Sequence, residues 1–329
     1  MDFRTEVDFD ADFSIGYSDR LLMLGSCFTE NIGQKFADSM LNVALNPFGI
    51  LFNPESIADA VERAIDGRHV TDTEVFEHNG LWSGFGFHGS FSSADRNEAI
   101  SRMNAGIDSA HECIGKASRL ILTFGTAYVY RLKESGKVVA NCHKLPADRF
   151  TREMLGIQSI VDRYSHLIDR LAGINPDLHI ILTVSPIRHM RDGAHQNQLS
   201  KSTLLLATNA LAEKYGNVHY FPSYEIVLDD LRDYRFYDTD MVHPSGLAID
   251  YIWQKLCAKC FSTSDLATMD DIRKLQSALN HRPINPNTDE FRNFALRQLD
   301  FAEQLAQKHS EIDFSKAIGH WKSVIGARD

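Results

Sequence analysis

Short apolar segments alternate with amphipathic segments along most of this chain. Runs such as LLML (21–24), LILTF (120–124) and IILTV (180–184) have the length and the continuous apolar character of strands buried on both faces. The longer stretches between them repeat apolar residues at helical spacing. This alternation predicts an α/β fold, in which helices cover both faces of a mainly parallel sheet.

Individual elements follow from the same spacing. The pattern predicts helices over residues 28–36, 54–65, 97–114, 157–172 and 201–215, and a closing helix from residue 244 onward. Asn53 is expected to cap the second helix, with Pro54 as its first residue. We also expect a strand in residues 218–224 and two hairpins, one within residues 74–93 and one that turns at residues 134–136.

The character of the sequence changes after Phe261. Residues 262–329 are rich in charge, have helical patterns and contain no strand signal. We therefore predict two parts, an α/β domain over residues 1–261 and a helical C-terminal extension over residues 262–329.

Composition and charge narrow the classes of partner. The 329 residues are 43% hydrophobic and 24% charged, which is ordinary for a globular protein. The formal net charge is −10 with no local run of Lys and Arg, which argues against nucleic acid as a partner. No apolar run approaches the roughly 20 residues that cross a bilayer, and the acidic N-terminal segment lacks the features of a signal peptide. We therefore expect a cytoplasmic protein with no membrane partner; the oligomeric state is not indicated.

The five cysteines do not indicate a disulfide framework, because their number is odd and they are scattered. Cys257 and Cys260 have C-x-x-C spacing inside an amphipathic helical pattern, and no second cysteine pair or histidine pair completes a zinc site. We interpret them as buried thiols and expect neither a metal nor another cofactor.

The first candidate catalytic residue is Ser26. It follows an apolar strand and Gly25 and precedes a helix, a geometry that presents a hydroxyl at the carboxyl edge of a parallel sheet, where ligands bind in open α/β folds. The helix start also favours a developing negative charge. The alternative is that Ser26 is simply a helix cap, a frequent role for serine.

The second candidate is the D-x-x-H segment of Asp240 and His243, directly before the closing helix. A hydroxyl nucleophile needs a base, and the base needs a carboxylate that orients it. This spacing supplies both groups from one short loop. Although D-x-x-H alone is a weak motif, the order of nucleophile first and acid–base pair last is informative.

Several blocks together resemble the GSCFA domain family. They are GSCF (25–28), FGTAYVY (124–130), NCHKLP (141–146), TVSPIRHMRDG (183–193), the N-x-x-S-K of residues 197–201, and the segment from YFPSYEI to DTDMVHPS. The resemblance covers about residues 20–255. The family is similar to SGNH and GDSL hydrolases and to polysaccharide O-acetylesterases. It implies a flavodoxin-like three-layer αβα sandwich with Ser26 as nucleophile, His243 as general base and Asp240 as the orienting acid.

The resemblance is less complete for the groups that would stabilise an oxyanion. In SGNH enzymes the donors are the N–H of the nucleophile, a Gly in the second block and an Asn in the third block. Gly49 matches the Gly, and Gly125 and Thr126 stand in the third block, but Ala127 or a neighbour occupies the place of the Asn. Losing one donor typically lowers the rate by ~100- to 1000-fold. Candidate replacements are Asn46, Asn141 and His143.

Three further residues complete the candidate set. Arg188 and His189 follow an expected strand, and the guanidinium of Arg188 is suited to gripping a carboxylate or phosphate. We consider both as substrate contacts, with local hydrogen bonding as the alternative. Cys27 raises the possibility of a thiolate nucleophile, but at one position after Ser26 we expect its side chain to turn into the fold.

The favoured function is therefore an SGNH-like serine esterase that removes O-acyl groups, acetyl above all, from a small-molecule or carbohydrate ester. The same acyl-enzyme could instead transfer its acyl group to an alcohol. A further alternative is a carbohydrate-binding module on a hydrolase fold that has lost activity, which the missing third-block Asn favours and the complete Ser, Asp and His set opposes.

Overall fold

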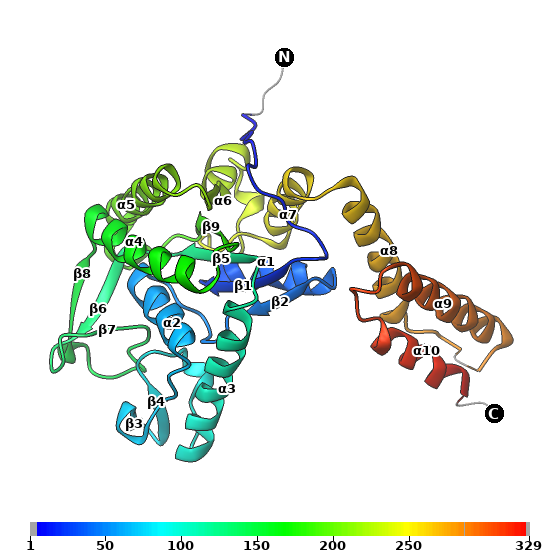
Figure 1. Cartoon of the computed structure of the whole chain (residues 1–329), viewed down its shortest axis with the longest axis horizontal. Helices are drawn as coiled ribbons and strands as arrows, with labels where there is room; N and C mark the ends of the chain where they lie inside the picture. Colours follow the sequence, from blue (N-terminus) through cyan, green and yellow to red (C-terminus); the bar gives the residue numbers. More distant parts are fainter. Residues whose placement is uncertain (1–4, 286, 327–329) are drawn as a thin grey trace.

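The computed structural model of the chain describes residues 5–285 and 287–326. Its centre is a five-stranded parallel sheet with the strand order β10-β9-β5-β1-β2 (Figure 1). The strands are β1 (Arg20–Gly25), β2 (Asn42–Leu45), β5 (Arg119–Phe124), β9 (His179–Val184) and β10 (Val218–Phe221). This is the flavodoxin-like order, and it confirms the expected α/β class.

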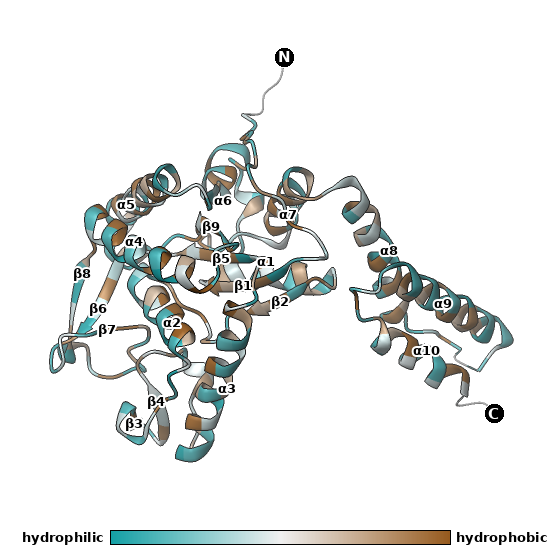
Figure 2. Ribbon diagram, in the orientation of Figure 1, coloured by the Kyte–Doolittle hydropathy of each residue, from teal (hydrophilic) through white to brown (hydrophobic). Residues whose placement is uncertain are grey.

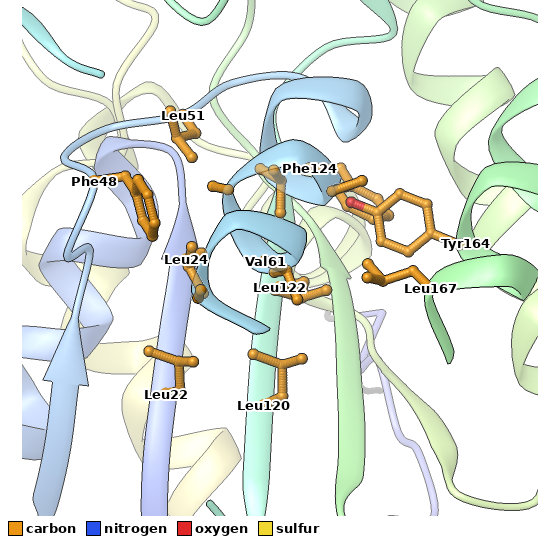
Figure 3. Packing of buried hydrophobic residues seen from close by; sticks show 14 of the residues in the cluster. Leu22, Leu24, Phe48, Leu51, Val61, Leu120, Leu122, Phe124, Tyr164 and Leu167 are labelled. Atoms are coloured by element: carbon orange, nitrogen blue, oxygen red, sulfur yellow. The ribbon is translucent and has the colours of Figure 1, made fainter. Parts of the chain in front are cut away.

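Alternate residues of the central strands face two separate hydrophobic cores, as the two-residue period of a strand requires. On one face, Leu22, Leu120 and Leu122 belong to a core that includes residues of helices α2, α3, α4 and α5 (Figure 3). On the other face, Leu21 and Ile121 pack with residues of α1 and α7. The helices are α1 (Cys27–Asp38), α2 (Pro54–Asp66), α3 (Arg96–Ile114), α4 (Ile157–Ile174), α5 (Gly193–Lys214) and α7 (Gly246–Cys260). The sheet is thus the middle of three layers.

Two small antiparallel sheets extend from this sandwich. Strands β3 (Val75–His78) and β4 (Leu81–Gly84) form the first expected hairpin. Strands β6 (Tyr128–Leu132) and β7 (Val138–Val139) form the second, and β8 (Phe150–Met154) joins the free edge of β6. The short helix α6 (Ser223–Glu225) follows β10.

The last part of the described chain is helical, as expected. It consists of α8 (Thr263–Leu279), α9 (Asp289–Lys308) and α10 (Ser315–Gly326). Helices α9 and α10 lie side by side, away from the central sheet, and α10 carries many apolar residues (Figures 1 and 2). Trp321 is buried against Ala278 and Ala295, while Ile272 of α8 packs into the core beneath α1 and α7. The division after residue 261 stays a prediction, and its outermost residues, 1–4 and 327–329, lie outside the described ranges.

Most expected elements are present, and the differences have physical reasons. Asn53 caps α2 through a hydrogen bond from Ser56 N to Oδ1 (2.8 Å). Strand β2 was not expected, because it is four residues long and only partly buried at the edge of the sheet. Helix α5 starts at residue 193 instead of 201. None of the described helices combines the length and apolar composition that a membrane crossing requires.

Candidate active site

Ser26 and Gly125 lie where the direction of strand addition reverses. From β1 the chain proceeds to β2 on one side and then to β5 on the other, so a crevice is expected at the carboxyl ends of β1 and β5. Ser26 follows β1, and Gly125 follows β5. The strand–Gly–Ser–helix reading is therefore confirmed as local structure. Gly25 is required in this turn, because a Cβ there would lie 2.6 Å from the carbonyl oxygen of Thr123.

Ser26 occupies the N-cap of α1. Its side chain is only 1% exposed, and its Oγ accepts a hydrogen bond from Phe28 N (3.3 Å). The capping contact uses an acceptor lone pair of the hydroxyl and leaves its proton available. The cap is thus a structural fact, whereas the nucleophilic role stays a prediction.

Cys27 packs against the core around α1 and α7, but its sulfur also faces the loop that carries His243, which was not expected. Its Sγ lies 3.7 Å from Nε2 of His243, and the residue is only partly buried. Because the Ser26 side chain folds back onto the first turn of the helix, the next side chain faces the loop that carries His243. Burial raises the pKa of the Cys27 thiol, so the neutral thiol is the dominant form near pH 7.

His243 is oriented by Asp240. Nδ1 of the imidazole lies 2.6 Å from Oδ2 of Asp240, while Oδ1 of the same carboxylate accepts from the backbone N–H groups of Val242 and His243 at 2.9 Å each. Met241 adopts a positive φ of 57° in this turn. These backbone and side-chain hydrogen bonds lower the pKa of Asp240 to about 2. The carboxylate is therefore ionised at neutral pH and holds the imidazole with Nε2 toward α1.

The backbone N–H groups expected to bind an oxyanion already have partners. Gly49 N donates to Asn46 O (2.7 Å), and the N–H groups of Gly125 and Thr126 both donate to Phe52 O (2.8 and 3.0 Å). The Oγ1 of Thr126 accepts from Tyr128 N (3.1 Å). In this structure these three residues shape the loops around the crevice and offer no free N–H to a ligand.

Asn46 presents a side-chain donor beside the Ser26 turn. Its Oδ1 accepts from Gly25 N (2.9 Å), while Nδ2 is buried and has no hydrogen-bond partner among the described residues. The backbone of Asn46 has a φ of 44°, a conformation that asparagine adopts more readily than most residues. Asn46 is thus a better-placed donor than the other two replacements suggested by the sequence.

Those other two, Asn141 and His143, have contacts of a different kind. Oδ1 of Asn141 accepts from His143 N (2.7 Å), and Nε2 of His143 lies 3.0 Å from Gly84 O. The ring of His143 packs edge-on against Phe76 (centroids 5.6 Å apart), and burial lowers its pKa. No contact joins either residue to Ser26 or His243 within the described part of the chain. Both serve the packing of the two hairpins.

His189 and Arg188 lie in the loop after β9. Nε2 of His189 is buried without a partner among residues 5–285 and 287–326, and lies 3.2 Å from where a Cβ on Gly125 would stand. Burial lowers the pKa of His189 to about 4, and the charge of Lys201 acts in the same direction. Arg188 is partly buried as a residue, and its guanidinium forms no hydrogen bond or ion pair with any described residue.

Cys257 and Cys260 lie in α7 as buried free thiols in the core beneath α1. Burial raises the pKa of each to about 12, which suits the interpretation as packing groups.

Two family models match this chain. The model of the GSCFA family matches residues 20–256, which include Ser26, Asp240 and His243. The chain belongs to the GSCFA family. The model described as the GSCFA domain protein, C-terminal domain, matches residues 272–325, within α8 to α10.

Beyond the family models, this GSCFA protein has a weak structural similarity to a solved protein. No curated protein matches it. Among solved structures, it is similar to an acetyl xylan esterase, Est2A, from the rumen bacterium Butyrivibrio proteoclasticus, with 13% identity and a TM-score of 0.37. The match covers 74% of this chain and 64% of that esterase chain, so the chain spans less than two thirds of its length.

Proposed function

We propose that this protein is a serine hydrolase that cleaves acyl esters, with Ser26 as nucleophile, His243 as general base and Asp240 as the group that orients it. The observation that supports this proposal most is the orientation of the His243 imidazole. Asp240 holds its Nδ1 at 2.6 Å, and its Nε2 faces the first turn of α1. A histidine fixed in this way at one nitrogen can take a proton at the other.

The proposed reaction gives each of these three groups one role. Ser26 Oγ attacks the acyl carbonyl while its proton passes to His243 Nε2, and the resulting imidazolium is stabilised by the Asp240 carboxylate. The imidazolium then protonates the leaving alcohol, which leaves an acyl-enzyme. Water, deprotonated by the same imidazole, hydrolyses that ester and restores Ser26. The reaction as written needs no group beyond the chain and water.

The oxyanion of each tetrahedral intermediate needs donors that are not already engaged. Asn46 Nδ2 and His189 Nε2 are buried nitrogens without partners among the described residues; Asn46 contacts the turn after β1, and His189 lies beside Gly125, which follows β5. The N-terminal end of α1 adds the positive end of a helix dipole at Ser26. We assign these groups the role that the third-block Asn has in SGNH enzymes.

For the substrate, we propose an O-acetylated carbohydrate, on the strength of the family resemblance. The charges of Lys201 and Arg188 lie near each other beside the loop after β9, so we expect a neutral or anionic ester to be tolerated better than a cationic one. The acyl-enzyme could also be passed to an alcohol acceptor, which is distinguished from hydrolysis by competition between that alcohol and water. The non-catalytic binding module remains the alternative for a protein that forms no acyl-enzyme.

One observation favours a second candidate nucleophile. Cys27 Sγ is 3.7 Å from His243 Nε2, within reach of a sulfur hydrogen bond, and a thiol next to an imidazole can form a reactive ion pair. Against this, burial raises the pKa of Cys27. Ser26 stays the proposal because it ends the strand–Gly turn that matches the family signature.

The test is active-site labelling with a fluorophosphonate, followed by mass spectrometry of the labelled peptide, together with hydrolysis of p-nitrophenyl acetate. Wild-type protein and Cys27→Ala should label at Ser26 and turn over, and Ser26→Ala should do neither. Label on Cys27, or activity in Ser26→Ala that is lost in Cys27→Ala, would transfer the role to the thiol. Wild-type protein that neither labels nor hydrolyses would contradict the hydrolase and favour the binding module.

A further inference from the structure

The N-terminal half of α5 carries three buried polar side chains on one face, Asn197, Ser200 and Lys201. Residues at i, i+3 and i+4 lie on the same side of a helix. Each of these side chains contacts a loop that follows a central strand. The inward face of this half of the helix is therefore a polar surface beneath the crevice.

Two of them hold the loop after β5. Lys201 Nζ donates to Gly125 O (2.5 Å), and Ser200 Oγ accepts from Ala127 N (2.8 Å). Ser200 Oγ also lies 3.1 Å from Thr126 Oγ1. Three consecutive residues of this loop, Gly125 to Ala127, are thus held by hydrogen bonds to one turn of α5.

The same face holds the loop after β9. Lys201 Nζ donates to Ser185 O (2.6 Å), and Asn197 Oδ1 accepts from His189 N (2.9 Å). Lys201 is therefore the group that joins the two loops directly.

A lysine in this position is costly. Lys201 is 0% exposed, and no carboxylate of the described residues forms an ion pair with it. Its Nζ also lies 5.8 Å from the centroid of the Tyr224 ring. Burial lowers the pKa of Lys201 to about 7, whereas the two carbonyl acceptors favour the ammonium. A methionine or leucine would fill the space without this cost, so packing alone does not explain the lysine.

The two loops meet at His189. Its Nε2 lies 3.2 Å from the Cβ position of Gly125, and its ring packs edge-on against Phe52, whose carbonyl accepts from Gly125 N (2.8 Å). A change in the spacing of the loops would move this nitrogen relative to Gly125.

We propose that Lys201 is a positioning residue of this site: its buried nitrogen ties the loops after β5 and β9 together and thereby holds His189 Nε2 beside Gly125 as an oxyanion donor. The inference rests on the proposed hydrolase function. His189 would contact the substrate, and Lys201 would act only through it.

The first test compares Lys201→Met with Lys214→Met, a control on the same helix whose exposed Nζ donates to Ser165 Oγ. With kcat normalised by active-site titration, Lys201→Met should lose ~100-fold in kcat with KM nearly unchanged, since small displacements of catalytic groups cost about that much. Lys214→Met should match wild type. A purely structural lysine would lower the melting temperature and the titrated fraction of active enzyme but leave kcat per active site intact, and that result would overturn the proposal.

A double-mutant cycle tests whether Lys201 acts through His189. His189→Phe removes Nε2 and keeps a ring, and should lose ~100- to 1000-fold in kcat. The double variant should then be no slower than His189→Phe alone, because the two changes remove one function. Multiplication of the two losses would contradict the proposed route.

Two further measurements test the role of Lys201 separately from a folding defect and from the proposed hydrolase function. If Lys201→Met does not fold, Asn197→Ala, which releases only the backbone of His189, should show the same loss of kcat with KM kept; full kcat would overturn the proposal. If wild type hydrolyses no ester, the proposed function fails. The structural effect of Lys201 on His189 can then still be measured by NMR of 15N-labelled histidine. Lys201→Met should shift the His189 ring signals and raise the pKa of that ring. Unchanged signals would contradict the claim that Lys201 positions His189.

Discussion

Nδ1 of His243 and Oδ2 of Asp240 lie 2.6 Å apart across a turn of three residues, and both oxygens of that carboxylate are engaged by His243. The pair is thus assembled locally, before any long-range packing is needed. This explains why a D-x-x-H spacing in the sequence could be interpreted as an acid–base pair.

The first prediction concerns Asp240→Asn. The new amide oxygen can still accept from the backbone N–H groups, but the amide nitrogen would face Nδ1 and favour the wrong tautomer of His243. We expect kcat for p-nitrophenyl acetate to fall ~100- to 10,000-fold, less than in His243→Ala. Asp238→Asn is the matched control, because Asp238 lies in the same loop and its Oδ1 accepts only from Thr239 N among the hydrogen bonds found (2.7 Å). Full activity in Asp240→Asn would remove Asp240 from the mechanism.

The second prediction concerns the titration of Asp240. Its pKa is lowered to about 2 from 3.8, so its contacts stabilise the folded protein fully above pH 4, and this contribution is lost as pH falls through about 2. The backbone N–H of His243 is the largest cause, so His243→Ala should raise the pKa only part of the way back to 3.8. Carbon-13 NMR of the labelled Asp240 carboxyl group measures its titration midpoint in wild type and in His243→Ala. An unchanged midpoint in His243→Ala would show that the imidazole contributes nothing.

The sequence predicted those features of the site that local structure determines. The turn at Ser26 and the cap at Asn53 follow from strand, glycine and cap signals within a few residues. The pairing of Asp240 with His243 is of the same kind. The place of Ser26 at the carboxyl edge of the sheet followed from the alternation of strands and helices, because a parallel sheet brings the carboxyl ends of its strands to one edge.

The rest of the site depends on contacts between distant segments. The start of α5 was predicted eight residues too late, at 201 instead of 193. The reason is that the inward face of its first turns carries Asn197, Ser200 and Lys201 in place of apolar residues, and such a polar face resembles a loop in the sequence. His189 was considered as a substrate contact, but its approach to Gly125 was not foreseen, since that approach requires the folded positions of β5 and β9. The contact of Cys27 with His243 was not foreseen because it joins residues 216 positions apart.

The third prediction concerns the unpartnered amide of Asn46. Asn46→Asp keeps an oxygen for Gly25 N and tolerates the positive φ, but it removes the Nδ2 donor and adds a negative charge beside a developing oxyanion. We expect kcat per titrated active site to fall at least ~100-fold. The melting temperature should fall as well, because the new carboxylate is buried. Asn53→Asp is the matched control, because Asp caps a helix as well as Asn does. Equal activity of the two variants would exclude Asn46 as a donor.

The fourth prediction concerns Arg188, a partly buried residue whose guanidinium forms no hydrogen bond or ion pair with any described residue. A cation that has lost part of its hydration and lies near Lys201 binds an anionic group favourably, because that group would satisfy its donors in a bidentate contact. Arg188→Gln should therefore raise KM for mono-p-nitrophenyl succinate about 10- to 100-fold, as expected for the loss of a hydrogen bond to a charged group, and leave KM for p-nitrophenyl acetate nearly unchanged. Arg232→Gln is the control, because Arg232 is exposed and already pairs with Asp229 at 2.8 Å. If KM for the two esters rises equally in Arg188→Gln, the guanidinium shapes the crevice and does not recognise charge. If neither changes, Arg188 lies outside the part of the crevice that the acyl group occupies.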